Sequence, residues 1–189
     1  MGWHLSEFSL KFKIFLKSRS SEDARRSLFQ TIWVEYQKPI LYFIQSMVHE
    51  DAEDIFQEVM AKVYQNIHRY NPVYKFSSWI YAVARNHCIN HIKRKKITTS
   101  SLETQAYALS DGSTPELNLL EMEQFQYLDQ AIQSLKPDNQ QIAFLKYFED
   151  LSCRQIGTIM NIAPGTVKSR LFTIRNQLKD ALEVYYENR

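Results

Sequence analysis

The chain has 189 residues, of which 44% are hydrophobic and 23% are charged, as is typical of a globular protein with one large or two small domains. Its formal net charge of only +2 does not by itself indicate a nucleic-acid binder. No apolar run is long enough to span a bilayer, and Lys11, Lys13 and Lys17 interrupt the apolar stretches near the N-terminus, so we expect a cytoplasmic protein without a secretory segment.

Residues 1–23 form an N-terminal extension, in which the stretch from Phe8 to Ile14 fits a short strand, a basic amphipathic helix or a segment without fixed structure. A first domain is expected at residues 24–96, where the apolar periodicity is helical throughout. It begins with a pair of helices that we expect to break near Pro39, because an internal proline removes a helical hydrogen bond. The apolar positions of this pair are Leu28, Ile32, Trp33, Tyr36, Ile40, Phe43, Ile44 and Met47.

A second long helix is predicted from Ala52 to Ile67, with Asn71-Pro72 ending it. Acidic residues open this helix, where they suit the positive end of the helix dipole. Opposite the apolar side lies a polar, acidic stripe. A solvated acidic face would look the same, but we favour a docking surface for a basic partner. The stripe consists of Glu50, Glu53, Asp54, Gln57 and Glu58.

A third helix is predicted to begin with Ser77 or Ser78 as its N-cap and to end in the basic run Lys93, Arg94, Lys95 and Lys96. Aromatic residues, Tyr70, Tyr74 and Phe76, precede it in a loop, where they are candidates for stacking on unpaired bases. Trp79 and Tyr81 are expected in the core instead. A basic run beside aromatic side chains is typical of proteins that bind single-stranded nucleic acid.

Residues 97–118 are rich in Ser, Thr, Gly, Pro and Gln, which predicts a flexible linker without fixed structure. A second domain follows at residues 119–189. The helical pattern resumes near Pro115, at the end of the linker, breaks at Lys136-Pro137, and continues with a helix from Gln140 to Phe148. The chain is therefore predicted to be all-α, with two small helical domains.

Residues 151–178 predict a helix-turn-helix. Ile156 and Ile159 give its first helix an apolar side, and Gly157 allows a close helix crossing. Asn161 suits a left-handed corner, and Pro164 fits the first position of the next helix. That helix turns Val167, Leu171, Ile174 and Leu178 inward. Its outer side suits the DNA major groove, although such a face is also compatible with plain solvated surface. The outer residues are Thr166, Lys168, Ser169, Arg170 and Arg175.

Three motifs, in this order, resemble the bacterial RNA polymerase sigma factors of the extracytoplasmic-function (ECF) type, group 4 of the sigma-70 family. The first is residues 51–58, Asp-Ala-Glu-Asp-Ile-Phe-Gln-Glu; the second is residues 79–86, Trp-Ile-Tyr-Ala-Val-Ala-Arg-Asn, with the basic run after it; the third is residues 165–171, Gly-Thr-Val-Lys-Ser-Arg-Leu. The resemblance covers about residues 25–96 and 122–183. It implies a region 2 domain at 24–96 and a region 4 domain at 119–189.

The resemblance also implies a role for each motif. Core RNA polymerase would be bound through its largest subunit's clamp helices and its flap, and the clamp contacts would be Glu53, Asp54, Gln57 and Glu58. The −10 element would be melted, and one of its bases would be flipped into the loop from Tyr70 to Ser78. The residues that contact this element would be Tyr74, Phe76, Arg85, Asn86, Lys93, Arg94, Lys95 and Lys96. The double-stranded −35 element would meet Thr166, Lys168, Ser169, Arg170 and Arg175. An anti-sigma factor is a further partner in many relatives.

Two alternatives come from other classes of protein. One is a dimeric helix-turn-helix regulator, which would bind its operator without polymerase. The other is a helical-bundle metalloenzyme, but the Glu-x-x-His pairs typical of such sites are absent. Cys88 and Cys153 lack metal-site spacing and are expected to be free thiols. We therefore predict neither cofactor nor metal nor enzymatic activity. The residues that the metalloenzyme would use are Asp51, Asp54, Glu58, His87 and His91.

Overall fold

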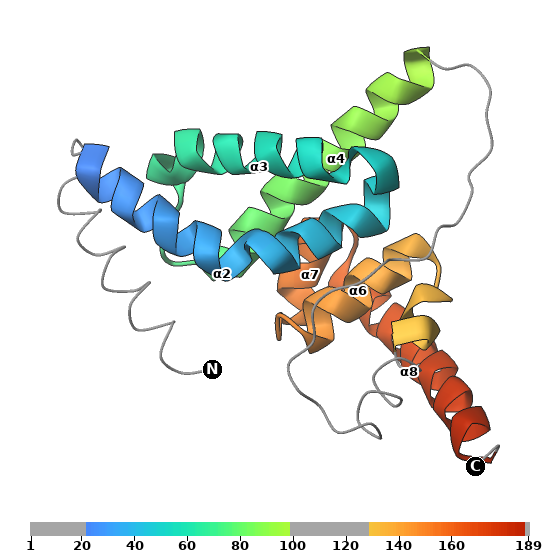
Figure 1. The fold of residues 1–189 in the computed structure, drawn as a ribbon. Coiled ribbons are helices and arrows are strands. Elements are labelled where there is room, and N and C mark those ends of the chain that lie inside the picture. The colour runs from blue at the N-terminus through green and yellow to red at the C-terminus, as the bar shows by residue number, and fades with distance from the viewer. Residues whose placement is uncertain (1–21, 99–128, 188–189) are drawn as a thin grey trace. The chain divides into compact units, whose positions relative to one another are not determined.

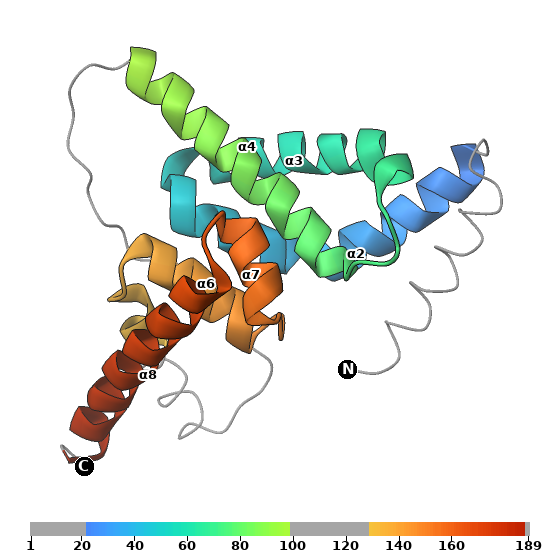
Figure 2. The same ribbon diagram turned by 180° about the vertical axis from the view of Figure 1, so that it is seen from behind.

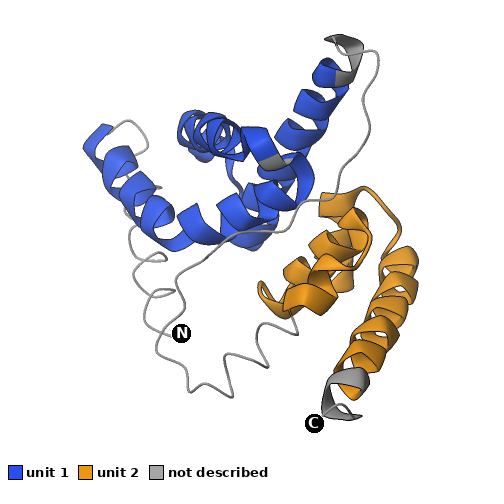
Figure 3. Ribbon diagram, turned by 45° about the vertical axis from the view of Figure 1, so that its right-hand side comes forward, with its two compact units in different colours: residues 1–95 blue, residues 96–189 orange. Residues whose placement is uncertain are grey.

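The computed structural model describes residues 22–98 and 129–187. This described part is helical, contains no strand, and divides into two compact units, residues 1–95 and 96–189 (Figure 3). The predicted all-α class with two helical domains is confirmed. The stretch from Phe8 to Ile14, the helix start near Pro115 and the linker after residue 98 lie outside the described residues.

The described part of the first unit begins with a single long helix, α2, from Glu22 to Val48 (Figure 1). The predicted break at Pro39 is wrong, because the helix continues through the proline. Pro39 is flanked by the buried side chains of Tyr36, Ile40 and Phe43. Their burial offsets the cost of an internal proline, about 3 kcal/mol. Tertiary packing therefore decides the conformation here.

A 3₁₀ turn, η1 (His49–Asp51), leads into α3 (Ala52–Asn66), and a second one, η2 (Ile67–Arg69), ends it before the predicted stop at Asn71. The helices α2 and α3 lie side by side (Figures 1 and 2). Their aromatic rings meet edge to face, Phe29 with Tyr64 at 5.1 Å and Trp33 with Phe56 at 5.3 Å between centroids. The order of these pairs makes the two helices antiparallel.

Helix α4 (Phe76–Thr98) crosses the other two (Figure 2). The rings of Phe76 and Tyr81 lie 5.4 Å from Tyr36 and 5.1 Å from Phe43, which fixes α4 on α2. The predicted serine N-cap is wrong, because Ser77 and Ser78 already lie inside the helix. The hydroxyls of both serines are buried without a hydrogen-bond partner. The helix also includes residues 97 and 98, which were assigned to the linker.

The described part of the second unit contains α6 (Pro137–Tyr147), α7 (Cys153–Met160) and α8 (Pro164–Glu187), preceded by helical residues 129–133. The predicted break at Lys136-Pro137 is confirmed, with Lys136 extended and Pro137 in the first turn of α6. The core of this unit is formed by buried aliphatic side chains. They include Ile132, Leu135, Ile142, Leu145, Leu151, Ile156, Ile159, Val167, Leu171 and Ile174.

None of the helices in residues 22–98 and 129–187 combines the length and the apolar character needed to cross a membrane.

Candidate functional site

The corner between α7 and α8 confirms the predicted helix-turn-helix. Asn161 ends α7 in the left-handed region, at φ 56° and ψ 46°. The backbone N–H of Ile162 then donates to the carbonyl oxygen of Gly157 at 3.0 Å. A Cβ atom on Gly157 would lie 2.7 Å from the carbonyl oxygen of Ile162, so only glycine fits this close approach. The backbone thus places the start of α8 firmly against α7.

The start of α7 is fixed by a capping box that the sequence analysis missed. The Ser152 hydroxyl accepts from the Gln155 N–H at 3.3 Å, and the Gln155 side chain accepts from the Ser152 N–H at 2.9 Å. The spacing Ser-x-x-Gln was a usable signal for it. Because both ends of α7 are fixed, the helix is a rigid support for α8.

Helix α8 has the two faces that its sequence predicts. Val167, Leu171 and Ile174 are buried against the other helices of the unit, whereas Leu178 is half-buried. Four of the five residues assigned to the −35 element lie on exposed surface. They are Thr166, Lys168, Ser169 and Arg175.

The fifth, Arg170, is only partly exposed, and its Nη1 donates to Oδ2 of Asp138 at 3.2 Å. Phe172 is a further outward residue that the sequence analysis passed over. Its ring is 63% exposed in the middle of the basic helix. The spacing from Val167 and Leu171 already excluded it from the inward stripe, and this was the available signal. The outer face of α8 is therefore polar and basic with one apolar ring.

In the first unit, α3 presents the predicted acidic stripe to solvent. Glu53, Asp54, Gln57 and Glu58 are all exposed, whereas Ile55 and Phe56 between them are buried. The acidic residues Glu53 and Asp54 lie in the first turn, where the helix dipole favours them. Four of the five stripe residues thus form an exposed, mostly acidic surface on α3, and Glu50 precedes them in η1.

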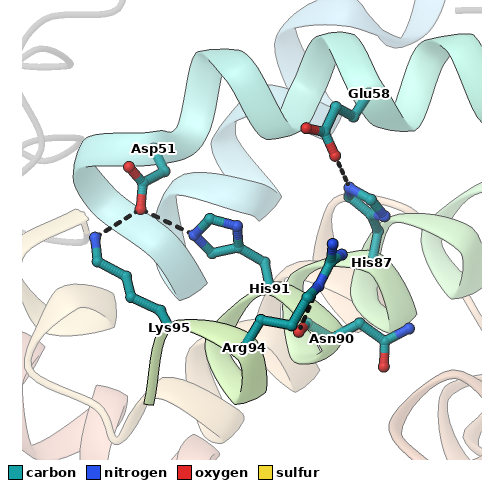
Figure 4. Close-up of polar contacts among 7 residues, drawn as sticks. All are labelled: Asp51, Glu58, His87, Asn90, His91, Arg94 and Lys95. Carbon is teal, nitrogen blue, oxygen red and sulfur yellow. Dashed lines mark hydrogen bonds and ion pairs between the residues drawn. The ribbon is translucent and has the colours of Figure 1, made fainter. Parts of the chain in front are cut away.

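Two carboxylates are tied to α4, Asp51 beside this stripe and Glu58 within it (Figure 4). Oδ2 of Asp51 lies 2.9 Å from Nε2 of His91 and 2.8 Å from Nζ of Lys95. The hydrogen bond from Lys95, followed by that from His91, lowers the pKa of the Asp51 carboxyl below its ordinary value. In turn, Asp51 raises the pKa of Lys95. One of the lysines assigned to DNA is therefore already paired with an acid.

The second tie is between Glu58 and His87, whose Oε2 and Nε2 atoms are 2.5 Å apart (Figure 4). The other ring nitrogen of His87, Nδ1, lies 2.6 Å from Nζ of Lys62. No local pattern in the sequence indicates these pairs, because the partners are 25 and 29 residues apart. In the described part of the chain, no group of three or more His, Cys, Asp or Glu side chains is arranged to hold a metal ion.

The aromatic residues before α4 separate into two kinds. Tyr74 is 67% exposed, so its side chain is accessible, and its role in binding a base stays a prediction. Phe76 and Tyr70 are buried, with ring centroids 5.1 Å apart, and Trp79 packs beside both. The stacking role predicted for Phe76 and Tyr70 is therefore corrected to a packing role. The Tyr70 hydroxyl donates to the carbonyl oxygen of Tyr74, which supports the loop.

The remaining residues assigned to the −10 element follow along α4. Asn86 is exposed and Arg85 is half-buried. Lys93, Arg94 and Lys95 are exposed, and Arg94 Nε donates to the carbonyl oxygen of Asn90 at 3.3 Å. Lys96 belongs to α4, but its side chain lies outside the described part. The basic surface therefore overlaps the tie to Asp51, because Lys95 belongs to both.

Comparisons with known proteins agree with this architecture. The family models for Sigma-70 region 2 and Sigma-70 region 4 match residues 32–97 and 125–178. The ECF RNA polymerase sigma factor SigW of Bacillus subtilis is 32% identical over 187 residues, covering 92% of this chain and 99% of its own length. The RNA polymerase sigma-H factor of Pseudomonas aeruginosa is 31% identical and covers 82% of this chain and 86% of its own length.

Among solved structures, the sigma factor RpoE of Bartonella quintana, crystallised with the anti-sigma factor NepR, has the same fold. Its TM-score is 0.65 at 20% identity, covering 82% of this chain and 97% of that one. The two region matches, the full-length likeness to SigW and the common fold together lead to one conclusion. This chain belongs to the ECF sigma factors of RNA polymerase.

Proposed function

We propose that this sigma factor binds core RNA polymerase through the acidic stripe of α3. The observation that carries this proposal is the exposure of Glu53, Asp54, Gln57 and Glu58 on one helix. Such a surface complements a basic partner, and in this family the expected partner is the pair of clamp helices in the largest polymerase subunit. Charge complementarity of this kind speeds association and selects the partner.

Promoter recognition is proposed to be divided between the two units. The outer face of α8 enters the major groove of the −35 element, where Thr166, Lys168 and Ser169 reach the base edges and Arg175 meets a phosphate. The loop with Tyr74, together with Asn86 on α4, receives an unpaired base of the −10 element. A flipped base costs a few kcal/mol, which its binding site offsets. The chain itself catalyses no reaction.

Two further partners are proposed. The region 4 unit is expected to meet the polymerase flap, as the family resemblance implies. An anti-sigma factor is expected because the similar protein RpoE was crystallised with one, NepR. Another protein of similar fold, CnrH, was likewise solved in complex with a protein partner, the cytosolic domain of CnrY. An inhibitor of this kind would cover surfaces that otherwise bind the polymerase.

The test is in vitro transcription on genomic fragments with sigma-free core polymerase, with and without this protein. New discrete start sites are expected, and Asp54→Lys and Gln57→Lys are expected to abolish them. Asp23→Lys, which places a cation on exposed α2 surface, is the matched control and should retain them. If no starts form while the free protein binds specific DNA, the dimeric regulator is correct instead.

A further inference from the structure

His87 is a buried polar residue on α4 whose two ring nitrogens are both engaged by α3. Only 3% of its side chain is exposed. Nε2 faces Glu58, Nδ1 faces Lys62, and these two partners lie one turn apart on α3. The imidazole therefore reaches from the interior of the first unit to the edge of the acidic stripe (Figure 4).

The chemistry of the partners determines where the ring proton lies. A lysine ammonium can only donate, so Nδ1 accepts from Lys62. The proton of the neutral ring is then on Nε2, which donates to Oε2 of Glu58. One oxygen of Glu58 is thus held by α4, and its other oxygen is left for a partner outside the chain. Lys62 and Glu58 together fix the ring in this tautomer.

These bonds contribute more to orientation than to stability. Glu58 is 62% exposed and Lys62 is also exposed, so water would solvate both if the ring were absent. Bonds to such exposed charges add little to folding stability. A glutamate that is fixed before binding, however, loses less side-chain entropy when it meets a partner.

We propose that His87 is a positioning residue for polymerase binding, which presents the Glu58 carboxylate in a fixed orientation at the edge of the acidic stripe. The inference rests on the proposed function, because it assigns Glu58 to the polymerase interface. It also links the helix assigned to the −10 element with the polymerase-binding helix through one side chain. His87 itself, being buried, touches neither polymerase nor DNA.

The geometry of the ring supplies a matched pair of variants. The side-chain nitrogen of glutamine is as many bonds from Cβ as Nε2, so His87→Gln can still donate to Glu58. The amide of asparagine ends at the level of Nδ1, so His87→Asn keeps a group for Lys62 and loses the one for Glu58. His87→Phe retains a buried ring without either bond, which provides a well-packed variant if His87→Asn does not fold.

The experiment is titration of fluorescently labelled full-length protein with core polymerase, with thermal unfolding measured in parallel. His87→Asn and His87→Phe are expected to weaken binding about threefold to tenfold, the range for one side chain that must be ordered on binding. His87→Gln is expected to stay within about twofold of the original. His91→Asn, at the neighbouring tie to Asp51, is the control and should bind normally.

A double-mutant cycle separates positioning from a general structural effect. In a Glu58→Ala background, His87→Phe should weaken binding no further, because the group that it positions is gone. The inference would be overturned if His87→Phe lowered polymerase affinity equally with and without Glu58. It would also be overturned if a folded His87→Phe variant bound polymerase normally. If Asp54→Lys also binds normally, the proposal that the acidic stripe binds polymerase is itself wrong. If Asp54→Lys fails to bind while His87→Phe binds normally, only the inference fails.

Discussion

Oδ2 of Asp138, in the first turn of α6, lies 3.2 Å from Nη1 of Arg170 on α8. The pair joins two helices of the second unit and engages a guanidinium that the sequence assigns to the −35 element. Arg170 is consequently held by the protein before any DNA arrives. A guanidinium held by a carboxylate offers its remaining N–H groups in a restricted set of directions.

This relationship predicts that Asp138 affects sequence discrimination at the −35 element. In Asp138→Asn, the ratio of holoenzyme affinities for an intact and a substituted −35 element is expected to fall about threefold to tenfold, because Arg170 must be ordered on binding. Promoter-binding titrations would measure this ratio. Asp180→Asn, farther along α8, removes the same charge and serves as the control. If both affinities rise equally, Asp138 acts only by repelling phosphate.

A second prediction concerns the two glycines of the helix-turn-helix. Gly157→Ala is expected to destabilise the second unit by about 1–3 kcal/mol, because the new methyl group meets the Ile162 carbonyl oxygen at 2.7 Å. At Gly165, an added Cβ atom would have no neighbouring atom within 4 Å. Gly165→Ala is therefore expected to stabilise α8 by up to about 1 kcal/mol. Urea unfolding of the full chain would compare them. Equal effects of the two substitutions would contradict this account of the corner.

The two thiols are expected to differ in reactivity. Burial raises the pKa of Cys88 to about 12, so almost none of it is thiolate at neutral pH. Cys153 is partly exposed at the start of α7. Iodoacetamide at pH 8 should therefore modify Cys153 first, and Cys88 only after unfolding, as peptide mass spectrometry would show. Early labelling of Cys88 would mean that α4 separates readily from the core of the first unit.

Asp51 should make stability sensitive to acid. Its folded-state pKa is lowered from 3.8, mainly by the hydrogen bond from Lys95 and then by that from His91. A carboxyl pKa that is lower in the folded state stabilises that state at any pH above the pKa of the unfolded chain. This contribution is lost as the pH falls through the pKa of the folded state. The difference in unfolding free energy between the original chain and Asp51→Asn should therefore shrink from about pH 5 to pH 2. A pH-independent difference would exclude this linkage.

The sequence predicted those elements whose causes are local. The corner at Asn161 and the start of α8 at Pro164 depend on the backbone preferences of single residues. The acidic stripe depends on helical spacing alone. Each was predictable because neighbouring residues determine it.

The predictions that failed have non-local causes. The helical conformation at Pro39 depends on the helices packed around it. The burial of Phe76 depends on Tyr36, which lies 40 positions earlier in the chain. The carboxylate–histidine ties depend on how α4 crosses α3, which no periodicity indicates. Sequence patterns therefore located the surfaces of the candidate site but not the contacts that orient their side chains.

The corner between α7 and α8 also has a consequence for the unfolded chain. Glycine would adopt the left-handed conformation of Asn161 without strain, but it would leave the unfolded chain freer. Asparagine tolerates the same φ, and Pro164 is confined near its helical φ even before folding. This corner therefore loses less conformational entropy on folding than a glycine-based turn would lose. The angle at which α8 leaves α7 is in this way partly encoded before the unit is folded.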